Sequence, residues 1–297
     1  MADVSSIFQE GISMVRGAVS NVTVEQQGFV KAFVRLCADG WMQGWHECNG
    51  GNLTYRMTAA EVASCRSFFR EESSAWVNMG VQAETLGGEF FVVTGAGVFM
   101  RNVGLDPAAA IGIVEINDKG DSWRIVWGFK EGGHPTSEFA SHFVAHAVRA
   151  AATSGACRVM YHAHPTSIIA LTFAAPIDAR ALSRILWRSM PECVMVFPSG
   201  VGVVPFMVPG SIDLARASED MMKAHDAIVW AQHGVLCSGS DFDSAFGLMH
   251  TIEKSAEIYA QACMLNGGPN FPQTITDENL RAIAASFSLS INEEFLD

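Results

Sequence analysis

Three histidines stand where they could bind one metal ion. His162 and His164 belong to the stretch YHAHPT (residues 161–166), at the end of an apolar segment. Side chains alternate along a strand, so residues i and i+2 project from the same face and two imidazoles can reach a common ion. His233 ends a second apolar segment, and Gly234 after it lets another group approach closely. Three neutral imidazoles suit a catalytic zinc site with an open position, although the spacing alone is equally compatible with ordinary histidines.

A rival set of candidate ligands lies on one predicted helix. Glu138, His142 and His146 are spaced i, i+4 and i+8 and therefore share a helix face. Paired histidines at i and i+4 bind zinc in some enzymes, but no glutamate base stands inside this pair. The favoured interpretation is that they are simply polar positions of the helix. His46 and Glu47 lack a second histidine at a suitable offset and are set aside.

Three turns have the composition of an anion site. They are residues 49–52 (NGGN), 94–97 (TGAG) and 135–137 (PTS). Backbone N–H groups freed by a turn, with hydroxyl and amide donors beside them, can bind phosphate without net positive charge. Ordinary turn chemistry uses the same residues, so each turn alone proves little. Neither a P-loop nor a Gly-x-Gly-x-x-Gly fingerprint is present.

Composition limits the class of protein. The chain has 297 residues, 49% of them hydrophobic, and a formal charge of −12. This predicts a sizeable core and argues against binding to a nucleic-acid backbone, which requires a basic face. Seven scattered cysteines without a Cys-x-x-Cys pair favour reduced thiols. With no basic, apolar N-terminal leader and no membrane-length apolar run, we expect a cytoplasmic protein.

The hydrophobic pattern alternates between the two kinds of secondary structure, which indicates a layered α/β fold. No linker or internal repeat divides the chain. Thr136 or Ser137 is expected to cap a helix that continues to about residue 152. The other predicted helices cover residues 25–44, 61–78, 179–189, 214–224, 241–265 and 277–286. The predicted strands cover residues 52–57, 90–94, 111–116, 123–127, 158–162, 193–197, 201–206 and 227–230.

Taken together, these motifs resemble the zinc-dependent class II aldolases of sugar phosphates. The resemblance is carried, in order, by residues 49–52, 93–97, 135–138, 162–164 and 230–234. It also covers residues 191–193, 197–202, 205–210 and 246–256, and it runs from about residue 30 to near residue 290. This ordered combination is far more specific than any single motif.

The resemblance implies a three-layer αβα fold around a central mixed, largely antiparallel sheet, in one domain over residues 1–297. It implies retro-aldol cleavage of a small-molecule sugar phosphate in a homotetramer, with active sites between subunits. One Zn²⁺ per subunit would be held by His162, His164 and His233, with Glu138 as the catalytic carboxylate. A second carboxylate, Glu192, would be contributed across the interface. The substrate phosphate would be held by Asn49, Gly51, Asn52, Ala96, Gly97, Thr136 and Ser137.

Two features depart from the family pattern. Ala96 stands where a serine is usual, which removes one hydroxyl from the expected phosphate site but leaves the backbone N–H. Residues 1–25 form an N-terminal extension with no assigned role. Two alternatives to the expected aldolase remain open: a related enzyme acting on another sugar phosphate, such as an epimerase, and a non-catalytic scaffold of the adducin type.

Overall fold

A single nine-stranded sheet runs through the protein. The computed structural model describes residues 22–297. The strand order is β2-β5-β4-β3-β1-β6-β9-β8-β7, and all neighbours are antiparallel except β7 and β8. The strands are β1 (Asn52–Arg56), β2 (Val77–Asn78), β3 (Phe90–Thr94), β4 (Ile111–Ile116), β5 (Ser122–Gly128), β6 (Val159–Ala163), β7 (Gly202–Val204), β8 (Ala227–Trp230) and β9 (Gly234–Gly239).

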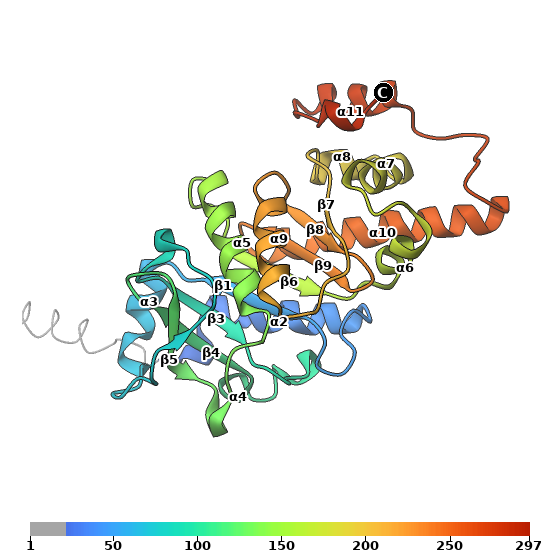
Figure 1. Cartoon of the computed structure of the whole chain (residues 1–297). Helices are drawn as coiled ribbons and strands as arrows, with labels where there is room; N and C mark the ends of the chain where they lie inside the picture. Colours follow the sequence, from blue (N-terminus) through green and yellow to red (C-terminus); the bar gives the residue numbers. More distant parts are fainter. Residues whose placement is uncertain (1–21) are drawn as a thin grey trace, which may run out of the picture.

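Helices cover both faces of this sheet, as Figure 1 shows. The helices are α2 (Gly28–Met42), α3 (Ala59–Cys65), α4 (Pro107–Ala110), α5 (Phe139–Ala152), α6 (Thr166–Ala174), α7 (Ala179–Ser189), α8 (Glu192–Val196), α9 (Ile212–Met222), α10 (Phe242–Asn266) and α11 (Asp277–Ser286). The predicted class, three αβα layers around a mixed and largely antiparallel sheet, is confirmed.

The alternation of side chains along β6 assigns each residue to one of the two layers. Tyr161 and Ala163 lie in the core cluster that packs beneath α2 and α10. Met160 points the other way, into the core beneath α5 and α9. His162 shares that second face, as expected for residues i and i+2 of a strand. The sheet therefore directs His162 toward the layer that contains the start of α5.

Two predicted elements are wrong. The helix predicted over 61–78 ends at Cys65, apart from a short 3₁₀ turn that follows. The backbone N–H groups of Arg70 and Ser74 instead donate to β5 carbonyls, so this segment runs along the sheet edge. The strand predicted over 193–197 is the helix α8, whose N-terminal flank is Pro191 with helical dihedrals. Proline is common at the start of a helix, because its fixed φ suits the helix and the N–H that it lacks would have no partner there.

The cap predicted for α5 is also displaced. The helix begins at Phe139, and Glu138 is the N-cap residue. The Thr136 side chain does stabilise the turn before the helix, because its hydroxyl accepts a hydrogen bond from the Glu138 N–H at 3.4 Å. The backbone N–H of Thr136 donates to the Thr94 carbonyl, which ties this turn to the end of β3. That link holds residues 135–138 out of the helix.

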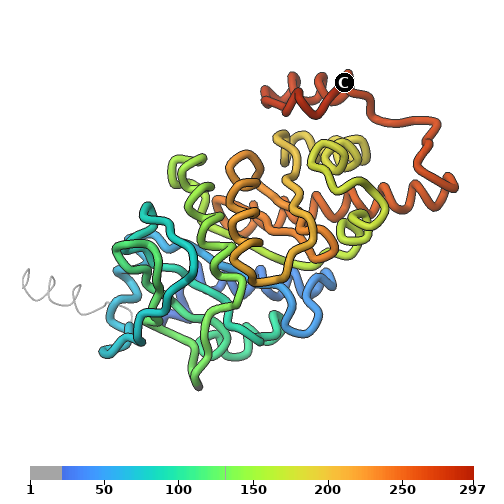
Figure 2. The backbone as a smooth tube through the Cα atoms, in the orientation of Figure 1, coloured from blue at the N-terminus to red at the C-terminus, as the bar shows by residue number. Residues whose placement is uncertain are grey.

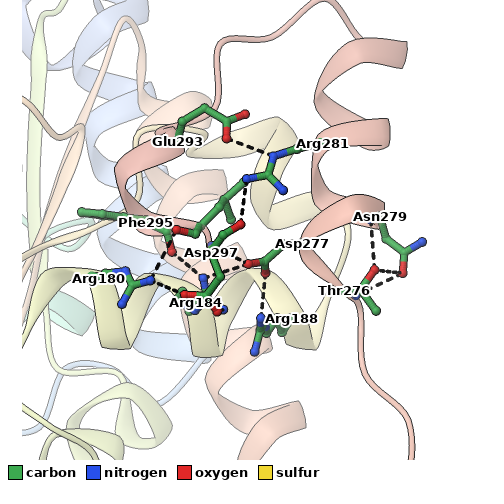
Figure 3. A network of polar contacts seen from close by, with 11 residues as sticks. Arg180, Arg184, Arg188, Thr276, Asp277, Asn279, Arg281, Glu293, Phe295 and Asp297 are labelled. Carbon is green, nitrogen blue, oxygen red and sulfur yellow. Dashed lines mark hydrogen bonds and ion pairs between the residues drawn. The ribbon is translucent and has the colours of Figure 1, made fainter.

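The C-terminal segment folds back along the molecule and ends beside α7 and α8 (Figure 2). Figure 3 shows the polar contacts that hold it there. Arg184 of α7 pairs with Asp277 at the start of α11 and with Asp297 at the chain end, at 3.0 and 2.7 Å. Arg188 also pairs with Asp277, at 2.7 Å. Ion pairs thus help to attach the end of the chain, together with Leu280, Ala284 and Leu296, which are buried in the core.

The N-terminal extension proposed for residues 1–25 lies mostly outside the described residues. Within the described part, Val24 is completely buried and joins the core cluster beneath α2. The core therefore begins at least as early as Val24. Among the described helices, none combines the length and hydrophobicity needed to cross a bilayer.

Candidate functional site

The three histidines predicted as ligands meet at one end of the sheet. One ring nitrogen of each lies within 4.8 Å of the others, for His162, His164 and His233. His162 is the last but one residue of β6, and His164 follows that strand directly. His233 lies in the turn between β8 and β9, and β9 pairs with β6, which brings the turn beside the strand end.

Gly234 allows this close approach. A Cβ atom there would lie 2.4 Å from the Ala163 carbonyl oxygen and 2.8 Å from the His162 ring. Real side chains do not tolerate such contacts, so only glycine lets the β8–β9 turn reach the histidine pair. From the sequence, Gly234 was expected to permit close approach of backbone or substrate. The groups that approach are the β6 backbone and the two histidine rings.

The tautomers of the first two histidines are set by their outer partners. His162 Nδ1 lies 3.0 Å from the Val235 carbonyl oxygen, which can only accept. His164 Nδ1 lies 2.6 Å from Glu47 Oε1. Both Nδ1 atoms therefore carry the proton, and both Nε2 lone pairs face the cluster, where they stand 3.1 Å apart.

This arrangement fits a metal ion. Two lone pairs at 3.1 Å repel each other unless a cation stands between them. His233 adds a third nitrogen donor, and imidazole is a preferred ligand of zinc. Burial, together with the neighbouring histidines, lowers the pKa of His162 well below its usual value, and the pKa of His233 to about 4. Both rings are therefore neutral near pH 7, the form that binds metals.

Glu138 faces the same cluster from the start of α5. Its Oε2 lies 3.5 Å from His162 Nε2, and its Oε1 lies 3.6 Å from His233 Nε2. The Asn52 side-chain amide donates to Oε2 at 2.6 Å. Asn52 is the β1 residue opposite His162, so the sheet register places donor, carboxylate and histidine together. Burial raises the pKa of Glu138, while the Asn52 hydrogen bond acts against this.

The rival helix face contains no metal site among the described residues. His142 and His146 are completely buried and bind the same hydroxyl, Thr54 Oγ1, at 3.0 and 2.9 Å. They are polar positions of the helix, as the favoured interpretation has it, and they are buried against β1. Burial lowers the pKa of His142 to about 3, so it is neutral. Through Thr54, these two histidines instead connect α5 to β1. The connection fixes the position of Glu138, which lies one helical turn before His142.

Two residues that the sequence pattern left aside contribute to the site. Glu47 binds His164, as described above. His46 Nδ1 donates to the Gly50 carbonyl at 3.0 Å, and its Nε2 accepts from the Tyr161 hydroxyl at 2.8 Å. His46 thereby fastens the glycine turn to β6. The local sequence offered only an adjacent His–Glu pair before this turn, and the partners lie more than 100 residues away.

The residues predicted to bind phosphate occupy two loop regions. Asn49, Gly51 and Asn52 lie just before and at the start of β1, where Gly51 has a φ of +75°. The turns 94–97 and 135–137 are joined by a bridge between Gly95 and Pro135. The Ala96 N–H, expected to be available for phosphate, already donates to the His134 carbonyl at 2.9 Å. Gly97 and Ser137 are exposed, and Thr136 is half-buried.

Glu192 is not brought to the histidines within one chain. It is the first residue of α8 and is exposed. That helix packs against α10 and α11, and in residues 22–297 no ion pair joins Glu192 to the cluster. Its role was expected across a subunit interface and stays a prediction.

Comparison with known proteins identifies the family of the chain. The family described as "Class II Aldolase and Adducin N-terminal domain" matches residues 31–260. The chain belongs to this family. It is 39% identical to a rhamnulose-1-phosphate aldolase of Enterobacter sp. (strain 638), over 90% of this chain and 96% of that protein. It is 38% identical to the Klebsiella pneumoniae rhamnulose-1-phosphate aldolase, over 93% and 98% of the two chains.

A solved structure supports the same relationship. A sugar-phosphate aldolase from Thermotoga maritima superimposes with a TM-score of 0.65 at 26% identity, covering 78% of this chain and 94% of that one. An L-fuculose-1-phosphate aldolase from Thermus thermophilus shares the fold, with a TM-score of 0.54 at 20% identity, covering 82% of this chain and 97% of that one. The family-level resemblance seen in the sequence is thereby confirmed.

Proposed function

We propose that this protein is a zinc-dependent rhamnulose-1-phosphate aldolase. It cleaves L-rhamnulose 1-phosphate to dihydroxyacetone phosphate and L-lactaldehyde in rhamnose catabolism. The observation that carries the proposal is the cluster of His162, His164 and His233 with Glu138 facing it, in a chain 39% identical to rhamnulose-1-phosphate aldolases over most of its length. A cytoplasmic homotetramer with sites between subunits completes the proposal.

The reaction breaks the bond between C3 and C4 of the ketose. The proton of the C4 hydroxyl leaves, the C4 oxygen becomes the aldehyde oxygen, and the bonding electrons remain on C3. His162, His164 and His233 would hold a Zn²⁺ ion, which would act as a Lewis acid toward the negative charge left by the bond cleavage. A proton delivered to C3 then yields dihydroxyacetone phosphate.

Glu138 is the residue proposed to carry that proton. It is buried beside the histidines, Asn52 binds its Oε2, and both of its oxygens face the cluster. A carboxyl group held beside the reacting carbon can protonate C3 in cleavage and remove the same proton in synthesis. Glu192 of a neighbouring subunit would accept the C4 hydroxyl proton. Asn49, Gly51, Asn52, Gly97, Thr136 and Ser137 would hold the phosphate, with Ala96 contributing only through its position in the turn.

The test is a cleavage assay with the purified full chain. L-Rhamnulose 1-phosphate, L-fuculose 1-phosphate and a pentulose phosphate are compared for release of dihydroxyacetone phosphate, with the metal content of each sample measured. We expect the highest kcat/KM with L-rhamnulose 1-phosphate and about one zinc per subunit. Preference for L-fuculose 1-phosphate, or an epimeric product without cleavage, would assign the protein to another branch. Absence of both stoichiometric metal and cleavage would instead indicate a non-catalytic scaffold of the adducin type.

A further inference from the structure

A cavity lies at the other end of the strands that form the site. β1 carries Asn52 at the catalytic end and Arg56 at its opposite end, while β6 is preceded by Arg158 and ends near His164. Arg56 lies four residue steps along the strand from Asn52, which is about 13 Å. The cavity has a volume of about 730 Å³, within the range of small-molecule sites.

Positive charge dominates the lining of this cavity. Arg56, Arg66 and Arg158 line it, and Glu89 is the only acidic side chain among its lining residues. The ion pair between Arg56 and Glu89 is long, 3.7 Å, and the Glu89 side chain is 36% exposed. One carboxylate therefore faces three guanidinium groups, in a chain whose formal charge is −12. The cavity is a local exception to the acidic balance of the protein.

Arg56 is buried with part of its guanidinium unpaired. The residue is only 7% exposed, and its Nε has no hydrogen-bond partner. Its Nη2 donates to the carbonyls of Gly155 and Cys157. Burial, and then the positive charge of Arg158, lower the pKa of Arg56. An anion in the cavity would offset the repulsion between the guanidinium groups of Arg56 and Arg158.

The other two arginines are also incompletely paired. Arg158 uses Nη1 to donate to the carbonyls of Arg56 and Met57. Arg66 is exposed, and its guanidinium carbon lies 5.8 and 5.7 Å from the ring centroids of Phe69 and Phe90, within cation–π range. Within residues 22–297, neither Arg66 nor Arg158 takes part in an ion pair. The N–H groups of Arg66 therefore have no carboxylate partner among these residues, and guanidinium groups suit phosphate oxygens.

We propose that this cavity is a second anion site, which binds a phosphate group through Arg56, Arg66 and Arg158. The group can be free phosphate or belong to a small organic phosphate, because the cavity exceeds the size of one phosphate. Planar guanidinium groups bind phosphate oxygens in pairs, which lysines do not. The site is separate from the turns proposed to hold the substrate phosphate.

The experiment is a calorimetric titration of the full metal-loaded chain with inorganic phosphate and with glucose 6-phosphate. The background variant is Ser137→Asp, which places a negative charge in the proposed substrate-phosphate site. In this background we compare Arg66→Gln with Arg281→Gln. Arg281 lies on α11 and pairs with Glu293, so its replacement removes the same charge far from the cavity. Arg66→Lys keeps the charge but loses the planar donors.

We expect Arg66→Gln to weaken phosphate binding about tenfold, as the loss of one charge-assisted contact would. Arg281→Gln should change the affinity for phosphate by less than about twofold. The affinity of Arg66→Lys should lie between those of the other two variants. Equal affinities for Arg66→Gln and Arg281→Gln would overturn the proposal, as would loss of all phosphate binding in the Ser137→Asp background. Tighter binding of glucose 6-phosphate than of phosphate would identify the ligand as an organic phosphate, and the reverse would identify free phosphate.

Discussion

The Nδ1 atom of His164 lies 2.6 Å from Glu47 Oε1, although the two residues are 117 positions apart. The contact keeps the Nδ1 proton in place and turns Nε2 toward His162 and His233. Carboxylate–histidine contacts of this kind orient metal ligands and raise their basicity. The Glu47 side chain is 66% exposed, so the contact forms at the mouth of the site rather than in the core.

We predict that Glu47→Gln weakens zinc binding by about 10- to 100-fold. The amide can still accept a hydrogen bond, but it lacks the charge that stabilises the ligand ring. Competition with a chelator measures the affinity without reference to activity. Glu72→Gln, at an exposed position elsewhere, is the matched control and should not change it. Unchanged zinc affinity in Glu47→Gln would show that the His164 ring is oriented by other groups.

We predict that Glu138→Ala lowers kcat by about 10²- to 10⁴-fold while zinc remains bound, because proton transfer at C3 loses its carrier. A second readout isolates the step. Exchange of the C3 proton of dihydroxyacetone phosphate with deuterium in solvent, measured without aldehyde, should be lost in the variant. Full turnover with zinc bound would remove Glu138 from the mechanism.

Much of the site could be predicted because its residues fall at the ends of recognisable elements. His162 and His164 alternate at the end of β6, a strand that the apolar pattern indicates clearly, and both rings do face one cluster. Because side chains alternate along a strand, Tyr161 and Ala163 were expected to face away from the two histidines. Both lie in the core beneath α2. Glu138 and the turns were assigned through resemblance to the family, since spacing alone left them ambiguous.

The remainder depends on contacts that no local pattern encodes. Glu47 reaches His164 only because the loop after α2 returns to the end of β6, where the His164 N–H donates to the Trp45 carbonyl. The apolar residues Cys193, Val194 and Phe197 led to the prediction of a strand where the structure has α8. Their burial at positions i, i+1 and i+4 also fits a helix. The segment after Cys65 mixes polar and aromatic residues and joins a sheet edge through its backbone.

We predict that Gly234→Ala abolishes stoichiometric zinc binding and destabilises the fold. The added Cβ would meet the Ala163 carbonyl and the His162 ring, so the β8–β9 turn must move away from β6. Gly247→Ala is the control, because nothing lies within 4 Å of a Cβ atom there, inside α10. That change should stabilise the protein by about 0.5–1 kcal/mol. Metal analysis and thermal unfolding of both variants test the contrast, and normal zinc content in Gly234→Ala would contradict it.

The C-terminal ion pairs predict a defined dependence of stability on pH. Burial raises the pKa of Asp277, but the Asp297 N–H and the guanidinium groups of Arg188 and Arg184 outweigh it, and the pKa falls to about 2. In the unfolded chain the pKa of an aspartate side chain is about 4. A lowered folded pKa means that the carboxylate stabilises the folded state above pH ~4, and that this stabilisation is lost as the pH falls from ~4 through ~2.

Asp277→Asn should therefore lower the free energy of unfolding by roughly 2 kcal/mol at pH 7, the scale of hydrogen bonds to charged groups. The difference between wild type and variant should shrink as the pH approaches 2, because the wild-type carboxylate then becomes protonated. Denaturant unfolding at several pH values measures both free energies. Asp220→Asn, which removes an exposed i,i+3 pair with Lys223, is the control and should change stability by less than about 0.5 kcal/mol. A difference that stayed constant between pH 7 and pH 2 would show that Asp277 acts through packing rather than through its charge.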